Sequence, residues 1–299
     1  MPGLQVLNDR LNMTDRVKLT PWYTSSFGLS NGISFAVIGY LFANFSWKIA
    51  CYTTSISAAL SAIIILFLIT SHNQKKNITE RKFFDLRPAF KNKEALGYIF
   101  SYGTHTYELF AYRAWIFTFL LWASLRTPNT ISSELISLII GIFMFIGMVS
   151  SLMGAKFCLD YGRKKVLMII GFATFVFSVI CAISISLPIW IIIILVGIYH
   201  AFIMLDSGAL TAGTVSVSDD NERGAILAFH SIIGFAGGAI AGPIIGFILD
   251  INGGTNNTSA WIFAFISMGL GSLFVFLIQY RSLVTLSLIH ISEPTRQLC

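Results

Sequence analysis

Eight long apolar segments constrain this chain more than any other feature. A membrane-spanning helix needs about 20 mostly apolar residues, and the segments that meet this need are 22–43, 49–70, 97–124, 133–156, 166–186, 188–213, 224–249 and 260–280. The composition agrees, because 55% of the residues are hydrophobic and 11% are charged, whereas soluble domains carry roughly 25% charged residues. We therefore predict an all-α, polytopic integral membrane protein.

The Lys and Arg residues predict its orientation. Sixteen of them lie in the N-terminal tail and on alternate connections, whereas the opposite connections hold only Lys48 and Arg126. Cytoplasmic loops hold the excess of Lys and Arg, so we expect both termini in the cytoplasm and the protein in a bacterial inner (plasma) membrane. The same topology explains the net charge of +6 without nucleic-acid binding, which would need a basic stripe on a soluble face.

Enzymatic and metal-binding functions find little support. The four cysteines are scattered without the spacing of a disulfide framework or a zinc site. His105 and Glu108 have the spacing of a metal-binding pair on a helix, but no second pair accompanies them. A nucleophile elbow, a phosphate loop and a dinucleotide fingerprint are all missing from the sequence. We predict no enzyme, no cofactor and no metal.

Polar residues inside the apolar segments are the candidate functional residues, because a charged group in the bilayer is costly and by default marks a pathway. The third segment places His105, Glu108 and Tyr112 on one helix face, and Arg113 points away from Glu108 by nearly half a turn. The later segments add His200, Asp206 and His230.

Each of these residues also has a structural interpretation. Glu108 would then be a protonated packing residue or part of a buried ion pair, and His105 a satisfied core histidine. Asp206 and His230 lie at similar depth in neighbouring spans, so we expect them to pair; alternatively the sixth span ends early and Asp206 lies in a wet vestibule.

A faint internal repeat supports a two-halved architecture. Gly28, Gly32 and Gly39 in the first span match Gly234, Gly238 and Gly246 in the seventh to within one residue. Ordinary close helix packing explains such glycines equally well, whereas a parallel repeat is the arrangement of some secondary transporters.

Three features resemble the major facilitator superfamily of twelve-helix transporters: the loop DYGRKK at 160–165, the run Gly238-x-x-x-Gly242-Pro243-x-x-Gly246, and the long basic connection 71–96. The resemblance implies that the eight spans are helices five to twelve of that fold. Residues 1–70 would then end the N-terminal half, 71–96 would be the cytoplasmic inter-domain loop, and 97–285 the six-helix C-terminal half.

Both ends of the chain carry further expectations. MPGLQVLNDRL resembles the cytoplasmic end of the family's fourth helix, so four more helices are expected upstream as missing partners. LSLIHISEPTR, at 286–296, resembles the translation of a sequencing-library adaptor. We therefore expect 286–299 to be an artefact and exclude it from functional argument.

The resemblance also implies a cytoplasmic gate made of Asp160, Gly162, Arg163, Lys164 and Lys165. The acid would approach the N-terminus of the first span, capped by Thr20 with Pro21 as its first helical residue, and Arg163 would pair with Asp9 or Asp15. The loop departs from the family pattern, since Leu159 stands at the family's Asp position and Ala155 at its first Gly. The alternative is a basic loop that only obeys the positive-inside rule.

The glycine–proline run resembles a motif of the family's exporters but lies in the equivalent helix of the other half. Its expected role is close packing at Gly238, Gly242 and Gly246, with a kink at Pro243; a purely structural role is the alternative.

The predicted function is secondary active transport of a small solute, amphiphilic or zwitterionic, by alternating access across the lipid bilayer, coupled to protons. The alternatives are a non-transporting sensor or scaffold and an inactive fragment.

Overall fold

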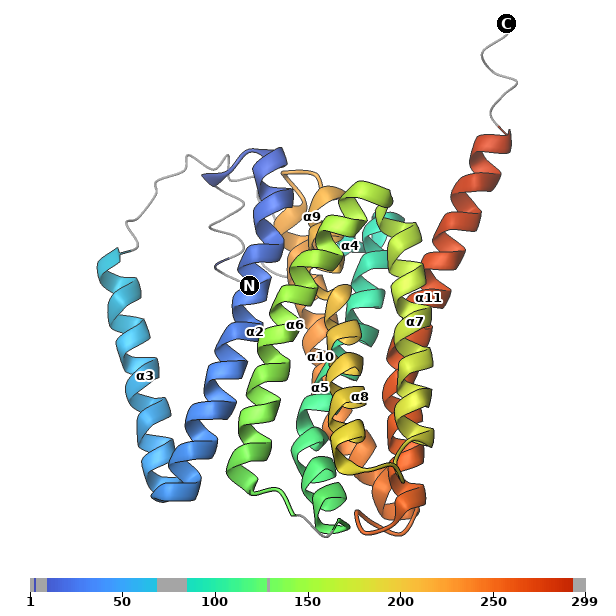
Figure 1. The fold of residues 1–299 in the computed structure, drawn as a ribbon. Coiled ribbons are helices and arrows are strands. Elements are labelled where there is room, and N and C mark those ends of the chain that lie inside the picture. The colour runs from blue at the N-terminus through green and yellow to red at the C-terminus, as the bar shows by residue number, and fades with distance from the viewer. Residues whose placement is uncertain (1–2, 4–9, 69–84, 128–129, 293–299) are drawn as a thin grey trace, which may run out of the picture.

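The computed structural model describes residues 3, 10–68, 85–127 and 130–292. Within these ranges the chain forms helices and connections, with no strand. The helices are α2 (Met13–Asn44), α3 (Trp47–Leu68), α4 (Arg87–Lys91), α5 (Lys93–Leu125), α6 (Ser133–Tyr161), α7 (Arg163–Ile183), α8 (Ile189–Leu205), α9 (Ser207–Ser216), α10 (Arg223–Ile251) and α11 (Thr258–Ser292). Most of the helices run alongside one another as a bundle, and α3 stands apart from it beside α2 (Figure 1).

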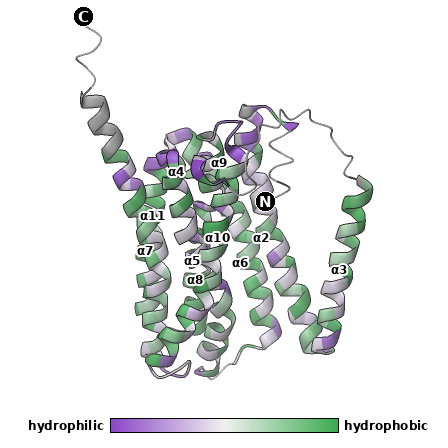
Figure 2. Cartoon of the chain, turned by 180° about the vertical axis from the view of Figure 1, so that it is seen from behind, coloured by the Kyte–Doolittle hydropathy of each residue, from purple (hydrophilic) through white to green (hydrophobic). Residues whose placement is uncertain are grey.

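Seven of the eight predicted spans are confirmed as described helices long and apolar enough to cross a membrane, with α8 and α9 together making one of them. The eighth, α5, is 33 residues long but is not among these seven. Its neighbours explain its polarity, because α5 packs against α6, α8, α9, α10 and α11, which shield its polar side chains. Figure 2 shows hydrophobic residues along the helices and hydrophilic ones gathered at the end near α4 and α9, here called the basic end.

The sixth predicted span is interrupted. α8 ends at Leu205 and α9 begins at Ser207, with Asp206 between them. The Asp206 carbonyl still accepts a hydrogen bond from the Leu210 amide (2.9 Å), so the interruption is local and the chain continues in helix to Ser216. The alternative in which the span ends early at Asp206 is therefore wrong, and Asp206 is 3% exposed.

The first span begins earlier than predicted. α2 starts at Met13, and the side chain of its N-cap Asn12 accepts from the Asp15 amide at 2.9 Å. Thr20 lies inside the helix, where its hydroxyl donates to the Arg16 carbonyl (2.7 Å), and Pro21 is also internal. The prediction of a start at Thr20 and Pro21 was wrong. Thr20 finds its hydrogen-bond partner within the preceding turn. Pro21 removes one helix hydrogen bond, but it packs near Gly208 of α9, and this packing compensates for the lost stability.

The ends of the predicted domains are only partly described. Most of the predicted loop 71–96 lies outside the described residues, and its last part forms α4 and the first turn of α5. The predicted artefact begins within α11, and residues 293–299 lie outside the described ranges. Both assignments stay predictions.

Glycines allow close helix approach throughout the bundle. An added Cβ at Gly32 of α2 would lie 2.9 Å from the Gly141 carbonyl oxygen of α6. In α10, the predicted packing glycines face α5: an added Cβ would lie 3.1 Å from Phe110 at Gly238, 3.6 Å from Ala114 at Gly242 and 3.1 Å from Trp115 at Gly246. α10 is a single helix with Pro243 inside it, so the kink stays a prediction.

The closest approach joins α6 to the end of α8, and it yields a stability prediction. An added Cβ at Gly154 would clash with the Leu205 carbonyl oxygen, a backbone atom that cannot rotate away. Gly154→Ala is expected to lower the free energy of unfolding by about 1–3 kcal/mol, because the methyl group forces the helices apart. Thermal unfolding of the purified protein measures this, with Gly242→Ala as the control; equal melting temperatures for the two variants would contradict the packing.

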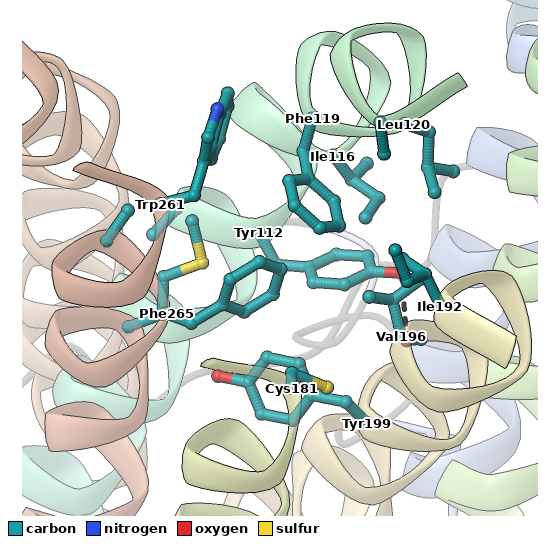
Figure 3. Close-up of a cluster of buried hydrophobic side chains, with 14 of the residues drawn as sticks. Tyr112, Ile116, Phe119, Leu120, Cys181, Ile192, Val196, Tyr199, Trp261 and Phe265 are labelled. Carbon is teal, nitrogen blue, oxygen red and sulfur yellow. Dashed lines mark hydrogen bonds between the residues drawn. The ribbon is translucent and has the colours of Figure 1, made fainter. Parts of the chain in front are cut away.

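The main apolar core lies between α5, α8 and α11. Figure 3 shows Tyr112 among Phe119, Tyr199 and Phe265, and all four side chains are at most 1% exposed. The Tyr112 hydroxyl donates to the Val196 carbonyl at 3.1 Å. Tyr112, predicted as a pathway residue, therefore lies in the core with its hydroxyl satisfied.

Candidate functional site

The predicted gate loop is a turn of one residue at the basic end. α6 ends at Tyr161 and α7 begins at Arg163, and Gly162 between them has φ = +91°, which favours glycine. The Arg163 Nη1 atom donates to the Ser216 hydroxyl (2.6 Å), and Lys164 Nζ lies 2.6 Å from Glu94 Oε1. The loop thus ties α7 to α9 and to α5.

The predicted partners of this loop are only partly tested. Arg163 binds Ser216 instead of Asp15, whereas Asp9 lies outside the described residues and stays a prediction. Asp160 and Lys165 are exposed and form no ion pair within the described ranges. The true N-terminus of α2, at Asn12, is eight residues before Thr20, so the helix end that Asp160 was expected to approach does not exist at that position.

A different ion pair connects the first span to the basic end. Arg16 Nη1 lies 2.9 Å from Asp220 Oδ1, and Arg223 also donates to Asp220. Hydrogen bonds from Arg223 and then Arg16 lower the pKa of Asp220 below its usual range. Sequence reasoning missed this contact because both partners are ordinary charged residues of polar connections, far apart in the chain.

The lowered pKa of Asp220 predicts an acid-dependent loss of stability. Its contribution is present above the unfolded pKa of about 3.9 and is lost as the pH falls through the lower folded value. We expect Asp220→Asn to lose this part of the pH dependence, with an effect of at most about 1 kcal/mol since the pair is exposed. Unfolding measured between neutral and acid pH tests this, and the same loss in the neighbouring variant Asp219→Asn would argue against it.

His105 and Asp206 lie against each other within the bundle. The His105 Nδ1 and Asp206 Oδ1 atoms are 2.7 Å apart, and both side chains are buried. His105 comes from α5, whereas Asp206 lies at the interruption between α8 and α9. The interruption therefore brings a carboxylate to the middle of the bundle, against a polar face of α5.

The predicted pairing of Asp206 with His230 is wrong. The two ring nitrogens of His230 contact hydroxyls of α9, Thr214 at 3.1 Å and Thr211 at 3.5 Å. The ring also stacks on Tyr102, with centroids 4.0 Å apart. Equal depth in neighbouring spans is not sufficient for a contact, because the rotation of each helix about its axis decides which side chains meet.

Glu108 is enclosed by protein hydroxyls. Its carboxylate accepts hydrogen bonds from Tyr199 of α8 (2.6 Å) and from Ser272 of α11, and the residue is 1% exposed. Sequence reasoning missed both partners, since single hydroxyls in apolar helices carry no distinctive pattern.

Arg113 and His200 have no polar partner within the described part of the chain. All three guanidinium nitrogens of Arg113 and both ring nitrogens of His200 are buried without a hydrogen bond. The Arg113 guanidinium carbon lies 5.0 Å from the ring centroid of Phe27 in α2. The His200 ring stacks on Tyr112, with centroids 4.9 Å apart.

A cavity of about 320 Å³ lies within the bundle, with His105 in its wall. α2, α5 and α10 contribute to its wall, together with Met204 of α8 and two residues of α9. His105 is the one predicted pathway residue among its described lining residues, which also include Phe27, Phe110 and hydroxyls such as Ser30, Thr106 and Ser207. The described residues contain no group of three His, Cys, Asp or Glu that could hold a metal ion.

The comparison with known families agrees with this architecture. A family model described as Major Facilitator Superfamily matches residues 106–296, more than half of the chain. The chain belongs to the major facilitator superfamily. No match was found among the curated proteins.

Membership of the major facilitator superfamily makes this chain an integral membrane transporter protein. The matched range begins within α5, one residue after His105, and includes all of α6 to α11. It therefore covers Glu108, Arg113 and Asp206 and the DYGRKK loop of this facilitator. It also includes 286–296, for which the adaptor origin stays a prediction.

Proposed function

We propose that this protein is a secondary active transporter that moves a small solute by alternating access and couples that movement to protons. The observation that carries the proposal is the His105–Asp206 pair, an acid and a base buried 2.7 Å apart inside a membrane bundle, with His105 at the wall of the cavity. Glu108, one turn further along α5, supplies a second buried acid.

The position of the pair suits a proton-coupled cycle. His105 is held by α5, and Asp206 by the junction of α8 and α9, so relative movement of these helices changes the distance between the two charges. Separating a buried ion pair is costly. Protonation of Asp206 or deprotonation of His105 removes one of the two charges, so the helices can then separate at a lower free-energy cost. A solute that binds better to the separated arrangement therefore favours proton uptake or release at this pair.

The basic end is proposed as the gate of this cycle. Three interactions cross between helices there: Arg163 with Ser216, Lys164 with Glu94, and Arg16 with Asp220. In the proposed cycle they hold this end closed and release when it opens, with the bend at Pro243 letting α10 move. From the positive-inside distribution, we propose that the basic end faces the cytoplasm.

Solute-dependent proton flux tests the function. The protein is reconstituted into vesicles that contain a pH-sensitive dye, and a solute collection is screened for acidification or alkalinisation that empty vesicles do not show. Solute movement without proton movement would contradict the coupling. If neither the 299-residue chain nor a longer reading frame moves a solute, the sensor or scaffold function is favoured.

The assay is run on two versions of the gene. The expectation that four spans precede Met1 stays a prediction, and resequencing the source DNA through both ends of the reading frame tests it. We expect the 299-residue chain not to transport alone and the restored frame to do so; uptake by the 299-residue chain would overturn that expectation.

A further inference from the structure

We propose that the solute of this transporter carries an anionic group and that Arg113 binds it. This inference rests on the proposed function and names the chemical class of its substrate. The sequence-based expectation was an amphiphilic or zwitterionic solute. The present proposal instead gives the solute a single, negative charge.

The first observation is the unsatisfied guanidinium of Arg113. None of its three nitrogens has a hydrogen-bond partner within the described residues, although all three are buried. A buried charge without a partner is strongly unfavourable. The planar fork of N–H donors on an arginine matches a carboxylate or a similar oxyanion, so an anionic ligand is the partner that this site lacks.

The second observation is that the nearby acids are already engaged. Both oxygens of Glu108 accept hydrogen bonds, from Tyr199 and Ser272. Asp206 lies against His105. Neither buried carboxylate forms an ion pair or a hydrogen bond with Arg113 among the described residues.

The third observation is the chemistry of the adjoining cavity. Arg113 lies over the ring of Phe27, and Phe27 and Phe110 both line the cavity. Its described lining residues combine apolar side chains and hydroxyls and include no Asp or Glu. His105, whose Nε2 atom has no partner, is an unsatisfied polar group at the wall, whereas Arg113 lies against the wall residue Phe27 and is not itself among the described lining residues.

Together these observations select one class of solute. A cationic or zwitterionic molecule would need an acidic residue for its ammonium group, and the described cavity wall offers none. A small organic anion with an apolar body would place its charge at Arg113 and its body against the aromatic side chains.

Ligand binding tests this without requiring transport. Three probes share one phenyl body and differ in charge: phenylacetate is an anion, phenylacetamide is neutral and phenethylamine is a cation. Thermal unfolding of the purified 299-residue chain, followed by tryptophan fluorescence, is measured with each probe at millimolar concentrations. The variants are Arg113→Gln, Arg113→Lys and the exposed control Arg126→Gln, whose guanidinium lies over Trp122 outside the site.

We expect phenylacetate alone to raise the melting temperature of the unsubstituted protein and of Arg126→Gln. Arg113→Gln should bind phenylacetate about 10- to 100-fold more weakly, the loss typical of a hydrogen bond to a charged group. Arg113→Lys should lie between the two, since an ammonium keeps the charge but not the fork. Without any probe, Arg113→Gln should melt higher than the unsubstituted protein, because an unpaired buried charge has been removed.

Several results would overturn the proposal. Stabilisation by the amine or the amide that survives in Arg113→Gln would assign another solute class and leave the transport function standing. A probe-free Arg113→Gln that melts lower than the unsubstituted protein would show that Arg113 has a protein partner. Failure of all three probes would also reject the site. Phenylacetate binding by the 299-residue chain, with no proton flux from a longer reading frame in vesicles, would keep the anion site and reject the transport function instead.

Discussion

Glu108→Gln is expected to abolish solute-dependent proton flux while leaving the protein folded. Glutamine has nearly the same shape, and its carbonyl oxygen accepts the Tyr199 hydrogen bond that Glu108 accepts at 2.6 Å. Its amide group faces Ser272, whose hydroxyl can accept as well as donate. The substitution therefore removes the exchangeable proton without opening the core, and we expect at least a tenfold loss of flux.

Flux in vesicles with equal amounts of folded protein measures this effect. Glu134→Gln is the matched control, since Glu134 is an exposed acid in the first turn of α6 and should leave the flux unchanged. Normal flux in Glu108→Gln would falsify the proton role of Glu108 and identify it as a structural residue that anchors Tyr199 and Ser272.

His105→Phe is expected to produce the largest loss of stability, about 3–5 kcal/mol in the free energy of unfolding. It leaves Asp206 buried, at 3% exposure, without the His105 ring nitrogen that lies 2.7 Å from its carboxyl oxygen, and removal of one member of a buried acid–base pair has an effect of this size. Phenylalanine retains an aromatic ring of similar size, so the loss of packing is small by comparison.

Thermal unfolding of two further variants separates charge from packing. His200→Phe replaces an equally buried histidine whose nitrogens have no partner in the described structure, and it should cost much less than His105→Phe. The double variant His105→Phe/Asp206→Asn should recover much of the stability, because no charge is then left unpaired. Equal losses in the two single variants would show that the 2.7 Å contact contributes little.

The burial of the candidate residues was predicted more accurately than their contacts. Intramembrane polarity alone selected His105, Glu108, Arg113, Asp206 and His230, and the structure buries these side chains or their charged atoms in the bundle. Their partners were predicted poorly. Asp206 meets His105 instead of His230, and Arg163 binds Ser216 instead of Asp15.

The local start of α2 shows the same limit. Thr20 and Pro21 have the chemistry of a helix start, and a sequence pattern contains no information about the α9 surface that lies against Pro21. Asn12, an equally good cap, lay eight residues earlier. Capping propensities are weak next to the packing of a long helix, so tertiary contact selected between two plausible starts.

The amino-acid order was sufficient for the membrane class, seven of the spans and the family resemblance, because hydropathy over 20 residues and short loop motifs are local properties. Packing decided which polar groups were satisfied. Glu108 was enclosed by hydroxyls from α8 and α11, while Arg113 was left without a partner in the described residues. Hydrogen bonding depends on distances of a few ångströms between helices far apart in the chain, and these distances follow from how the helices rotate and approach.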